Sequence, residues 1–350
     1  MKRVVLTAPG RLEVQEAPVP RPGPGEALLR IRAVGVCGSD LHMFKEGAIG
    51  GISLTDAAGP FVPGHECMGV VQDAGPGTDR SLVGRRVFVE PAINCRQCRW
   101  CLAGKPNVCP HHSFLGTPPR NGCLAEYMVH PAWLCQPLPD DVSDDAAVLL
   151  EPLAIALHSL ERVAATVGQS AVVLGAGPIG LAHVLLLARA GAAPLLATDV
   201  LDYRAECAAR LGATAVANPR KTDVPALVAD LTAGAGADMV FECAGVPETF
   251  GQMVRCAAPA GRVAVVGIPV KDELTFRHSA ARRKGLDVLM IRRANLTFHR
   301  ALGAARADGG RLLKALESLA THHWPMEQCQ QAFEAAAEYR DGVLKAIINV

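Results

Sequence analysis

Residues 171–180 read Ala-Val-Val-Leu-Gly-Ala-Gly-Pro-Ile-Gly, and this stretch decides the predicted fold. Its four leading apolar residues predict a buried strand, and the apolar residues after it predict a helix over 179–190. In this strand–turn–helix setting a GxGxxG pattern is specific: Gly175 permits a tight turn, Gly177 lets the backbone approach a pyrophosphate, and Gly180 lets helix and strand pack closely. The stretch therefore predicts a dinucleotide-binding unit.

An acidic residue, Asp199, ends the next predicted strand. A carboxylate at that place can accept both ribose hydroxyls and repels a 2′-phosphate, so the sequence favours NAD over NADP. Arg204 either serves the adenine side of the cofactor or is a solvated helix residue, and the sequence leaves both open. An ordinary strand–helix turn is the alternative for the whole pattern; the strand, helix and acid together disfavour it.

Outward from this unit, strands and helices alternate toward the carboxyl end. The predicted strands are 194–198, 214–217, 239–242 and 262–267, and the predicted helices are 203–211, 224–232 and 248–256. Such alternation predicts an α/β domain with a doubly wound parallel sheet. After Arg293 the pattern predicts helices over 296–306 and 311–319 and a strand over 343–348, too little for a third domain.

The first 150 residues have a different texture. Short apolar runs between Gly- and Pro-rich turns predict a mostly β domain, with strands at 4–6, 27–32, 68–72 and 86–90. Residues 144–163 have helical spacing that Pro152 interrupts. The tail after Arg293 is expected to return to this first domain.

Composition excludes several classes of function. Lys plus Arg number 35 against 34 Asp plus Glu, and aromatic residues make up 4%, so a nucleic-acid partner is not expected. Residues 171–188 hold one polar residue, His183, but three glycines and Pro178 interrupt them, so no membrane span is expected. Only three apolar residues follow Met1-Lys2-Arg3, too few for a secretory signal, and the expected compartment is the cytoplasm.

Four of the twelve cysteines lie close together, with the spacing Cys95-x2-Cys98-x2-Cys101-x7-Cys109. Four thiolates can close a tetrahedral zinc site with no open position, which is a structural site. The nearby Arg96, Arg99 and Lys105 would offset its negative charge. Free thiols are the alternative.

A second set of metal-type residues is dispersed. Cys37 lies in Gly-Val-Cys-Gly-Ser-Asp-Leu-His (35–42), His65 and Glu66 lie in Gly-His-Glu-Cys-Met-Gly (64–69), and Glu151 precedes Pro152. Spacing alone does not show that these residues meet. A buried cysteine, a core histidine and a glutamate in a helix would each be unremarkable singly.

Together these motifs resemble the zinc-dependent medium-chain dehydrogenases, and the resemblance covers essentially the whole chain. It implies a GroES-like zinc-binding catalytic domain over residues 1–153, a Rossmann NAD-binding domain over 154–291, and a return to the catalytic domain over 292–350. It also implies two zinc ions per subunit. One is the structural ion of the four cysteines, and the other is a catalytic ion among Cys37, His65 and Glu66.

The pair Glu66 and Glu151 is similar to the sorbitol (polyol) dehydrogenase branch, in which the second glutamate reaches zinc directly or through water. In this branch Ser39 and His42 would relay a proton to solvent. Asp40 would orient His65, although a local turn carboxylate explains it as well. The residues that the resemblance places at the cofactor are Gly175, Gly177, Pro178, Ile179, Gly180, Asp199, Arg204, Val266, Gly267, Ile268, Ile291 and Arg292.

The implied reaction moves a hydride from a secondary alcohol of a polyol or sugar acid to NAD and leaves a ketone. The implied partners are a small-molecule substrate and further copies of the chain, as a dimer or tetramer. Two positions depart from the branch: Met43 stands where an aromatic residue is frequent, and Arg293 where a tyrosine is frequent. Arg292 and Arg293 could attract the carboxylate of a sugar acid, or could bind the cofactor or a partner subunit.

Other functions stay open at this stage. A threonine- or aminocyclitol-type zinc dehydrogenase fits the same motifs, although threonine dehydrogenases usually carry threonine where this chain has Ser39. A zinc-free reductase would lack both sets of metal-type residues. A non-catalytic NAD-binding sensor would not need them.

Overall fold

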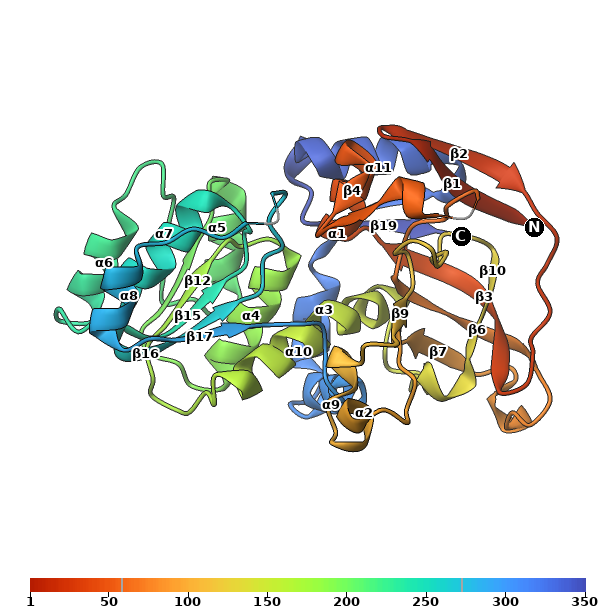
Figure 1. The fold of residues 1–350 in the computed structure, drawn as a ribbon, viewed down its shortest axis with the longest axis horizontal. Coiled ribbons are helices and arrows are strands. Elements are labelled where there is room, and N and C mark those ends of the chain that lie inside the picture. Colours follow the sequence, from red (N-terminus) through yellow and green to blue (C-terminus); the bar gives the residue numbers. More distant parts are fainter. Residues whose placement is uncertain (58, 272) are drawn as a thin grey trace. The chain divides into compact units, whose positions relative to one another are not determined.

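The computed structural model describes residues 1–57, 59–271 and 273–350. The chain forms two compact units, one of Met1–Glu151 with Phe298–Val350 and one of Pro152–Thr297. Both chain ends lie in the first unit (Figure 1). In the described ranges no helix has the length and apolar character needed to cross a membrane.

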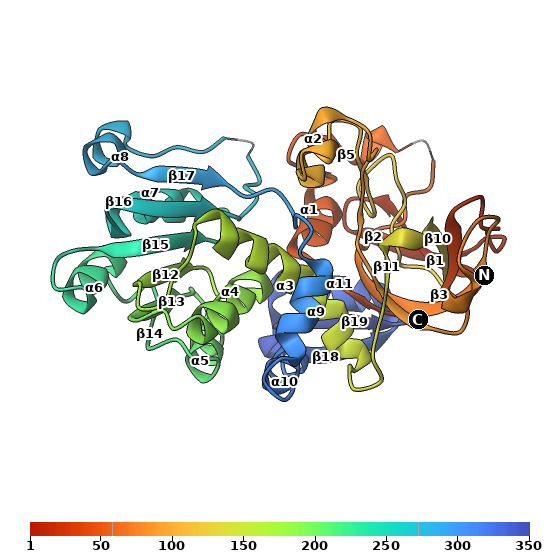
Figure 2. The same cartoon turned by 90° about the horizontal axis from the view of Figure 1, so that it is seen from below.

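The second unit is built on a parallel sheet. Its strands pair in the order β14-β13-β12-β15-β16-β17, which Figure 2 shows from β17 down to β14. The strands are β12 (Ala171–Leu174), β13 (Leu195–Thr198), β14 (Ala215–Ala217), β15 (Ala237–Glu242), β16 (Ala257–Val265) and β17 (Asp287–Met290). This order is that of a dinucleotide-binding doubly wound sheet, and it confirms the predicted fold class.

Helices connect these strands because each parallel crossover needs one. They are α4 (Pro178–Arg189), α5 (Asp202–Arg210), α6 (Val224–Leu231), α7 (Pro247–Cys256) and α8 (His278–Lys284). Every residue of β12 is buried, as expected for a central strand with helices over both faces. Apolar side chains of the sheet and of α6 and α7 form the core of this unit.

The first unit is mostly β. Its main sheet runs in the order β11-β7-β6-β3-β19-β18, and β10 also pairs with β3. These strands are β3 (Glu26–Gly35), β6 (Glu66–Ala74), β7 (Arg86–Val89), β10 (Tyr127–Pro131), β11 (Cys135–Pro137), β18 (Ala320–Pro325) and β19 (Lys345–Asn349). The late strand β19 thus lies beside the early strand β3.

Three small hairpin-like sheets complete the strands of this unit. They are β1 (Lys2–Ala8) with β2 (Arg11–Glu16), β4 (Ala48–Ile49) with β5 (Ile52–Ser53), and β8 (Ala92–Ile93) with β9 (Ser113–Phe114). Its helices are α1 (Gly38–Glu46), α2 (Arg99–Leu102), α9 (Phe298–Arg306), α10 (Arg311–Glu317) and α11 (Cys329–Glu338). Short 3₁₀ turns cover Leu54–Asp56, Arg80–Leu82, Pro106–Val108, Ala132–Leu134, Met326–Gln328 and Arg340–Gly342.

Some elements differ from the sequence prediction. Helix α3 (Asp144–Arg162) continues through Pro152 and contains the division between the units, because the surrounding apolar residues pack along its whole length. Strand β16 begins at Ala257, five residues earlier than predicted. Helix α8 is short and mostly polar and strand β17 spans four residues, so neither has a clear apolar period that would predict it. Strand β18 and helix α11 were also not predicted.

Candidate active site

The three dispersed ligand candidates of the first unit lie together. The ligand atoms of Cys37, His65 and Glu66 all lie within 4.8 Å of one another. Sheet register explains this, because Gly35, at the end of β3, is directly opposite Glu66, at the start of β6. Cys37 follows two residues later as the N-cap residue of helix α1. A thiolate, an imidazole and a carboxylate are all ligands that zinc accepts.

Asp40 holds this arrangement from the first turn of α1. Its Oδ2 accepts a hydrogen bond from the backbone N–H of Cys37 at 3.0 Å, and its Oδ1 accepts one from the N–H of Gly64 at 3.3 Å. The same Oδ1 lies 3.3 Å from His65 Nδ1. That separation gives electrostatic attraction, although Nδ1 has no well-aligned partner in the described part of the chain.

The charges around His65 favour a cation. Burial lowers the pKa of His65, but the negative charges of Asp40 and Cys37 outweigh it and hold the pKa well above its ordinary value. The pocket therefore stabilises one positive charge beside two negative side chains. A zinc ion bound through the ring would displace the proton and take over that role. The residues present thus fit a zinc ion.

A buried lysine that sequence reasoning missed completes the cluster. Lys345 of β19 and Glu66 are 2% and 1% exposed, and their side chains form an ion pair. Burial alone would lower the pKa of Lys345, but the charges of Glu66 and Cys37 raise it. The sequence contained one indication of this residue: Lys345 is the single lysine in the apolar run 343–348. Because a lysine is rarely buried without a partner, its position in a buried strand indicates an ion pair.

Glu151, Ser39 and His42 lie in the same unit, but the structure does not bring Glu151 into the 4.8 Å group. Glu151 is the last residue of the segment Met1–Glu151 in the first unit, and its side chain is buried. Burial raises its pKa to about 7. Ser39 and His42 are on α1 and are partly exposed. Burial, and then Lys45, lower the pKa of His42, which favours the neutral form of its ring. Met43, in contrast, is buried in the apolar core of the unit.

The four clustered cysteines also converge. All their sulfur atoms lie within 4.8 Å of one another. The Cys109 sulfur is 3.5 Å from that of Cys95 and 3.8 Å from that of Cys98. Two thiolates bound to zinc at about 2.3 Å in a tetrahedron are about 3.8 Å apart. The observed spacing therefore fits a four-thiolate zinc site.

The pKa values of two of these thiols are shifted in opposite directions by their surroundings. Backbone N–H groups of Gln97 and Cys98 lower the pKa of Cys95 to about 6. Burial and the neighbouring thiols raise the pKa of Cys101 to about 12. The raised pKa of Cys101 means that its thiolate is unfavourable among these sulfur atoms without a cation, which again fits a metal. Arg96 and Arg99, which the sequence offered as counter-charges, also lie over aromatic rings of Trp133 and Trp100.

In the second unit, the glycines of the dinucleotide motif meet the predicted steric demands. Gly175 has φ +100°, and a Cβ there would lie 2.9 Å from that of Ala244. A Cβ on Gly180 would lie 1.9 Å from the carbonyl oxygen of Gly175. Gly177 is the N-cap residue of α4, Pro178 is the first residue of the helix, and Ile179 follows. The helix start is therefore open for an anion at the backbone of Gly177.

Asp199 lies at the end of β13, next to this turn. Its Oδ2 accepts from the N–H of Ala176 and its Oδ1 from the N–H of Leu201, both at 2.9 Å. Arg204 Nη1 is 4.0 Å from Asp199, and a Cβ on Gly177 would lie 3.7 Å from the same nitrogen. The structure thus brings Asp199 and Arg204 to the glycine motif, as a site for ribose and phosphate requires.

The remaining cofactor candidates follow β16 and β17. The carbonyl of Glu242, at the end of β15, accepts from the N–H groups of Val266 and Gly267 at 2.8 and 2.9 Å. Glu242 Oε1 accepts from Ala244, Gly245 and Thr249. Ile268 and Arg292 are exposed, and Ile291 is partly exposed. Glu242 was not predicted to be a site residue, and its place at a strand end is the signal that was available.

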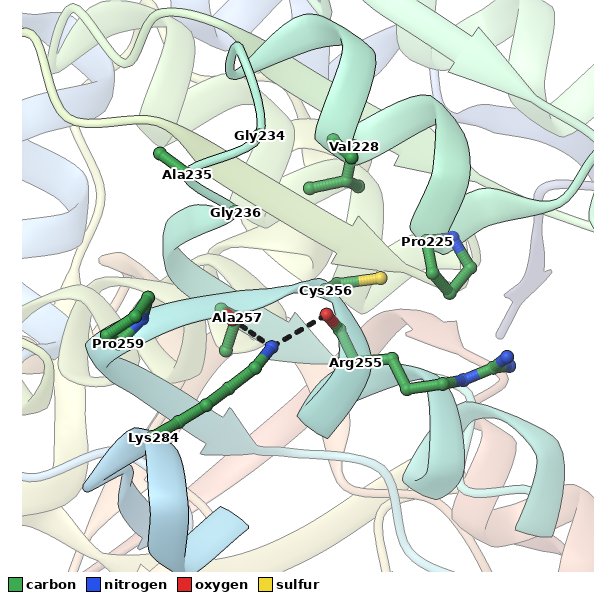
Figure 3. Close-up of a pocket in the computed structure, with 11 residues that line it drawn as sticks. Pro225, Val228, Gly234, Ala235, Gly236, Arg255, Cys256, Ala257, Pro259 and Lys284 are labelled. Atoms are coloured by element: carbon green, nitrogen blue, oxygen red, sulfur yellow. Dashed lines mark hydrogen bonds between the residues drawn. The ribbon is translucent and has the colours of Figure 1, made fainter. Parts of the chain in front are cut away.

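A separate hollow of about 220 Å³ lies at the opposite, amino ends of β15 and β16 (Figure 3). Its rim includes Pro225, Cys256 and Lys284. The Lys284 ammonium donates to the carbonyls of Val254 and Arg255 at 3.0 and 2.9 Å, so its charge is engaged by the end of α7. None of the predicted site residues lines this hollow.

Comparisons with known proteins agree with this picture. The family model of the alcohol dehydrogenase GroES-like domain matches residues 23–140, and that of the zinc-binding dehydrogenases matches residues 178–307. The sorbitol dehydrogenase of Bacillus subtilis (strain 168) is 31% identical over 348 residues, which is 99% of this chain and 97% of that protein. The L-idonate 5-dehydrogenase of Vitis vinifera is 32% identical over 345 residues, 97% of this chain and 92% of that protein.

A solved structure is similar over the same length. An alcohol dehydrogenase of Escherichia coli CFT073, solved as a complex with NADH, has a TM-score of 0.89 and 28% identity. The match covers 100% of this chain and 99% of that chain.

Proposed function

Because the chain belongs to the zinc-binding dehydrogenases, in the branch that contains the sorbitol dehydrogenases, we propose that it oxidises a secondary alcohol of a polyol or sugar acid to a ketone. The hydride passes to NAD. The observation that carries this proposal is the convergence of Cys37, His65 and Glu66. These three residues would hold a zinc ion and, as three protein donors, would keep one coordination position available for a substrate oxygen.

In this proposal Cys37, His65 and Glu66 hold the catalytic zinc. When bound, zinc lowers the pKa of a substrate hydroxyl, as it lowers that of water from about 15.7 to about 7 in the best case. Asp40 keeps His65 oriented through its Oδ1, and the burial of His65 and Glu66 limits the access of bulk water to these two ligands. Cys95, Cys98, Cys101 and Cys109 hold the second, structural zinc.

The protons move through residues of the first unit. Glu151, whose pKa of about 7 lies near neutral pH, is suited to take a proton or to hold a water molecule beside the zinc. Its place outside the 4.8 Å ligand group supports the water-mediated role. Ser39 and the neutral ring of His42 then pass the proton toward solvent.

The second unit holds NAD. Gly175, Gly177, Pro178, Ile179 and Gly180 receive the pyrophosphate, and Asp199 and Arg204 receive the adenosine ribose side. Val266, Gly267, Ile268, Ile291 and Arg292 flank the nicotinamide. We assign catalysis to residues 1–153 and 292–350, and cofactor binding to 154–291.

The protein acts as a homo-oligomer in this proposal, a dimer or a tetramer. Strand β17 supports this because it is an open edge of the parallel sheet and Met290 on it is 62% exposed. A cytoplasmic location is supported by the four-cysteine cluster, since a reducing compartment keeps its thiols available for a metal.

The test measures NAD reduction by the zinc-loaded protein on polyols, aldonates, hydroxy amino acids and aminocyclitols. We expect turnover on polyols or aldonates, with NAD preferred over NADP. Turnover only on hydroxy amino acids or aminocyclitols would move the substrate to another class. No turnover on any alcohol, with zinc and NADH bound, would contradict the proposed function.

A further inference from the structure

Two buried charges of opposite sign hold the peptide group that joins Val36 to Cys37. The ammonium of Lys345 donates to the Val36 carbonyl at 3.1 Å. The N–H of the same peptide group, on Cys37, donates to Asp40 Oδ2 at 3.0 Å. A cation therefore binds the oxygen end of this peptide dipole and an anion binds its N–H end.

Each of these two charges also reaches another ligand candidate. Lys345 Nζ donates to Glu66 Oε2. Asp40 Oδ1 lies 3.3 Å from His65 Nδ1. The peptide before Cys37 thus connects Glu66 on one side and His65 on the other. Strand pairing brings Lys345 there, because β19 pairs with β3, which in turn pairs with β6.

We propose that Lys345 is a positioning residue for the catalytic zinc, which rests on the proposed function. Its ammonium holds Oε2 of Glu66, leaves Oε1 for the metal, and fixes the backbone from which Cys37 extends. Lys345 therefore sets the placement of two ligands at once, while Asp40 sets the third.

Two observations argue that this lysine does more than fill the core. A buried ion pair contributes little to stability compared with apolar side chains of the same size, so folding alone does not call for a charge here. The backbone is also shaped around the pair: a Cβ on Gly35 would lie 2.6 Å from Glu66 Oε2, so a side chain at this position would displace the carboxylate that Lys345 holds.

The experiment compares wild type with Lys345→Met, Lys345→Arg and the control Lys284→Met. Lys284 also donates to backbone carbonyls, but it lies in the second unit and contacts no ligand candidate (Figure 3). Each protein is checked for folding by circular dichroism. Zinc per chain and its release to a chelator are then measured, and a cobalt-substituted sample gives the absorption spectrum of the Cys37 ligand. Activity and NADH affinity are recorded beside these.

We expect Lys345→Met to release one of its two zinc ions at least about tenfold faster, the range typical for residues that support a metal ligand. Its cobalt spectrum should shift and kcat should fall, while NADH affinity stays unchanged. Lys345→Arg keeps the charge but has a longer, planar head, so we expect a smaller spectral shift and intermediate zinc release. Lys284→Met should match wild type in all metal measurements.

Unchanged zinc release and an unchanged spectrum in Lys345→Met would overturn this inference while the proposed function stands. If the Met variant does not fold, Lys345→Gln replaces it, because Gln removes the charge but keeps a polar donor; unchanged zinc release and an unchanged spectrum in that variant would overturn the inference. A wild-type protein that holds one zinc ion and oxidises no alcohol would contradict the proposed function and, with it, this inference.

Discussion

The two metal-type clusters of the first unit are assembled in opposite ways. The four cysteines lie between positions 95 and 109, in a segment whose regular structure is one short 3₁₀ turn and the four-residue helix α2. Cys37 caps the start of helix α1, His65 and Glu66 lie at the start of strand β6, and Lys345 joins them from 279 positions beyond Glu66. The first cluster needs only its own loop, whereas the second needs the paired sheet of the whole unit.

This difference separates two uses of a metal. A local cluster with four protein donors has no coordination position left for a substrate. Its metal ion stabilises the folded form of a loop that has too few apolar residues to form a core of its own. A dispersed cluster with three protein donors keeps one position open and inherits rigidity from the sheet. The predictions below test this contrast, starting with the largest effect.

Removing the thiolate of the dispersed cluster should have the largest effect on turnover. We expect Cys37→Ser to lower kcat by at least about 10³-fold, because the zinc that acidifies the substrate hydroxyl is lost or misplaced. Metal analysis should find one zinc ion per chain in place of two, and NADH binding should be unchanged. Wild-type rates in this variant would show that Cys37 is not a ligand of a catalytic metal.

Removing a thiolate of the local cluster should affect stability instead. We expect Cys101→Ser to lower the free energy of unfolding of the first unit by about 3 kcal/mol or more, because zinc binding to such loops is coupled to folding. A thermal scan should show a melting point lower by about 6–12 °C. Turnover per folded molecule should stay within about twofold of wild type below that temperature. A loss of kcat as large as in Cys37→Ser would remove the contrast between the clusters.

The dinucleotide-binding motif is also local, but we expect it to determine cofactor preference and not, as the cysteine loop does, stability. Asp199→Ser removes a carboxylate at the end of β13 that would bond the ribose hydroxyls and repel a 2′-phosphate. Hydrogen bonds to charged groups contribute about 1.5–3 kcal/mol, so the ratio of kcat/KM for NAD over NADP should fall by about 10- to 100-fold. Kinetics with both cofactors check this. An unchanged ratio would contradict the role of Asp199 at the ribose.

The smallest expected effect concerns Glu90, which follows strand β7 just before the four-cysteine segment. Burial raises its pKa to about 7 from an ordinary 4.5. Because the folded pKa is the higher one, its contribution to stability is fully present below about pH 4.5 and is lost as pH rises through 7. Glu90→Gln removes a charge that must ionise while buried. We expect the variant to equal wild type at pH 4 and to be more stable at pH 8, by at most about 3 kcal/mol for a pKa shift of this size.

Urea unfolding at both pH values measures this difference. The neighbouring His130, whose Nε2 is 2.9 Å from the Glu90 carbonyl, titrates in both proteins and cancels from the comparison. A variant less stable than wild type at pH 8 would show that the Glu90 carboxylate has a favourable partner.

The sequence predicted the local features well and the long-range ones poorly. The strand–turn–helix around Gly175 and the four-cysteine cluster could be read because their geometry follows from neighbouring residues. The polyol dehydrogenase branch was predicted by resemblance and is confirmed by the relatives. Lys345 was missed because it reaches Glu66 only when β19 pairs with β3. The spacing of neighbouring residues does not predict a strand pairing between segments so far apart in the sequence. The roles of the site residues remain predictions.

The delivery of Lys345 by strand β19 also sets a time order for the newly made chain. Synthesis proceeds at about 5–20 residues per second, so about 14–56 seconds separate the appearance of Glu66 from that of Lys345. Before that interval ends, the four-cysteine loop and then the parallel sheet of the second unit have all their residues, while the Glu66 carboxylate still lacks its counter-charge. A ribosome that stops early thus leaves a chain able to form a cofactor-binding unit but without the complete support of its metal site.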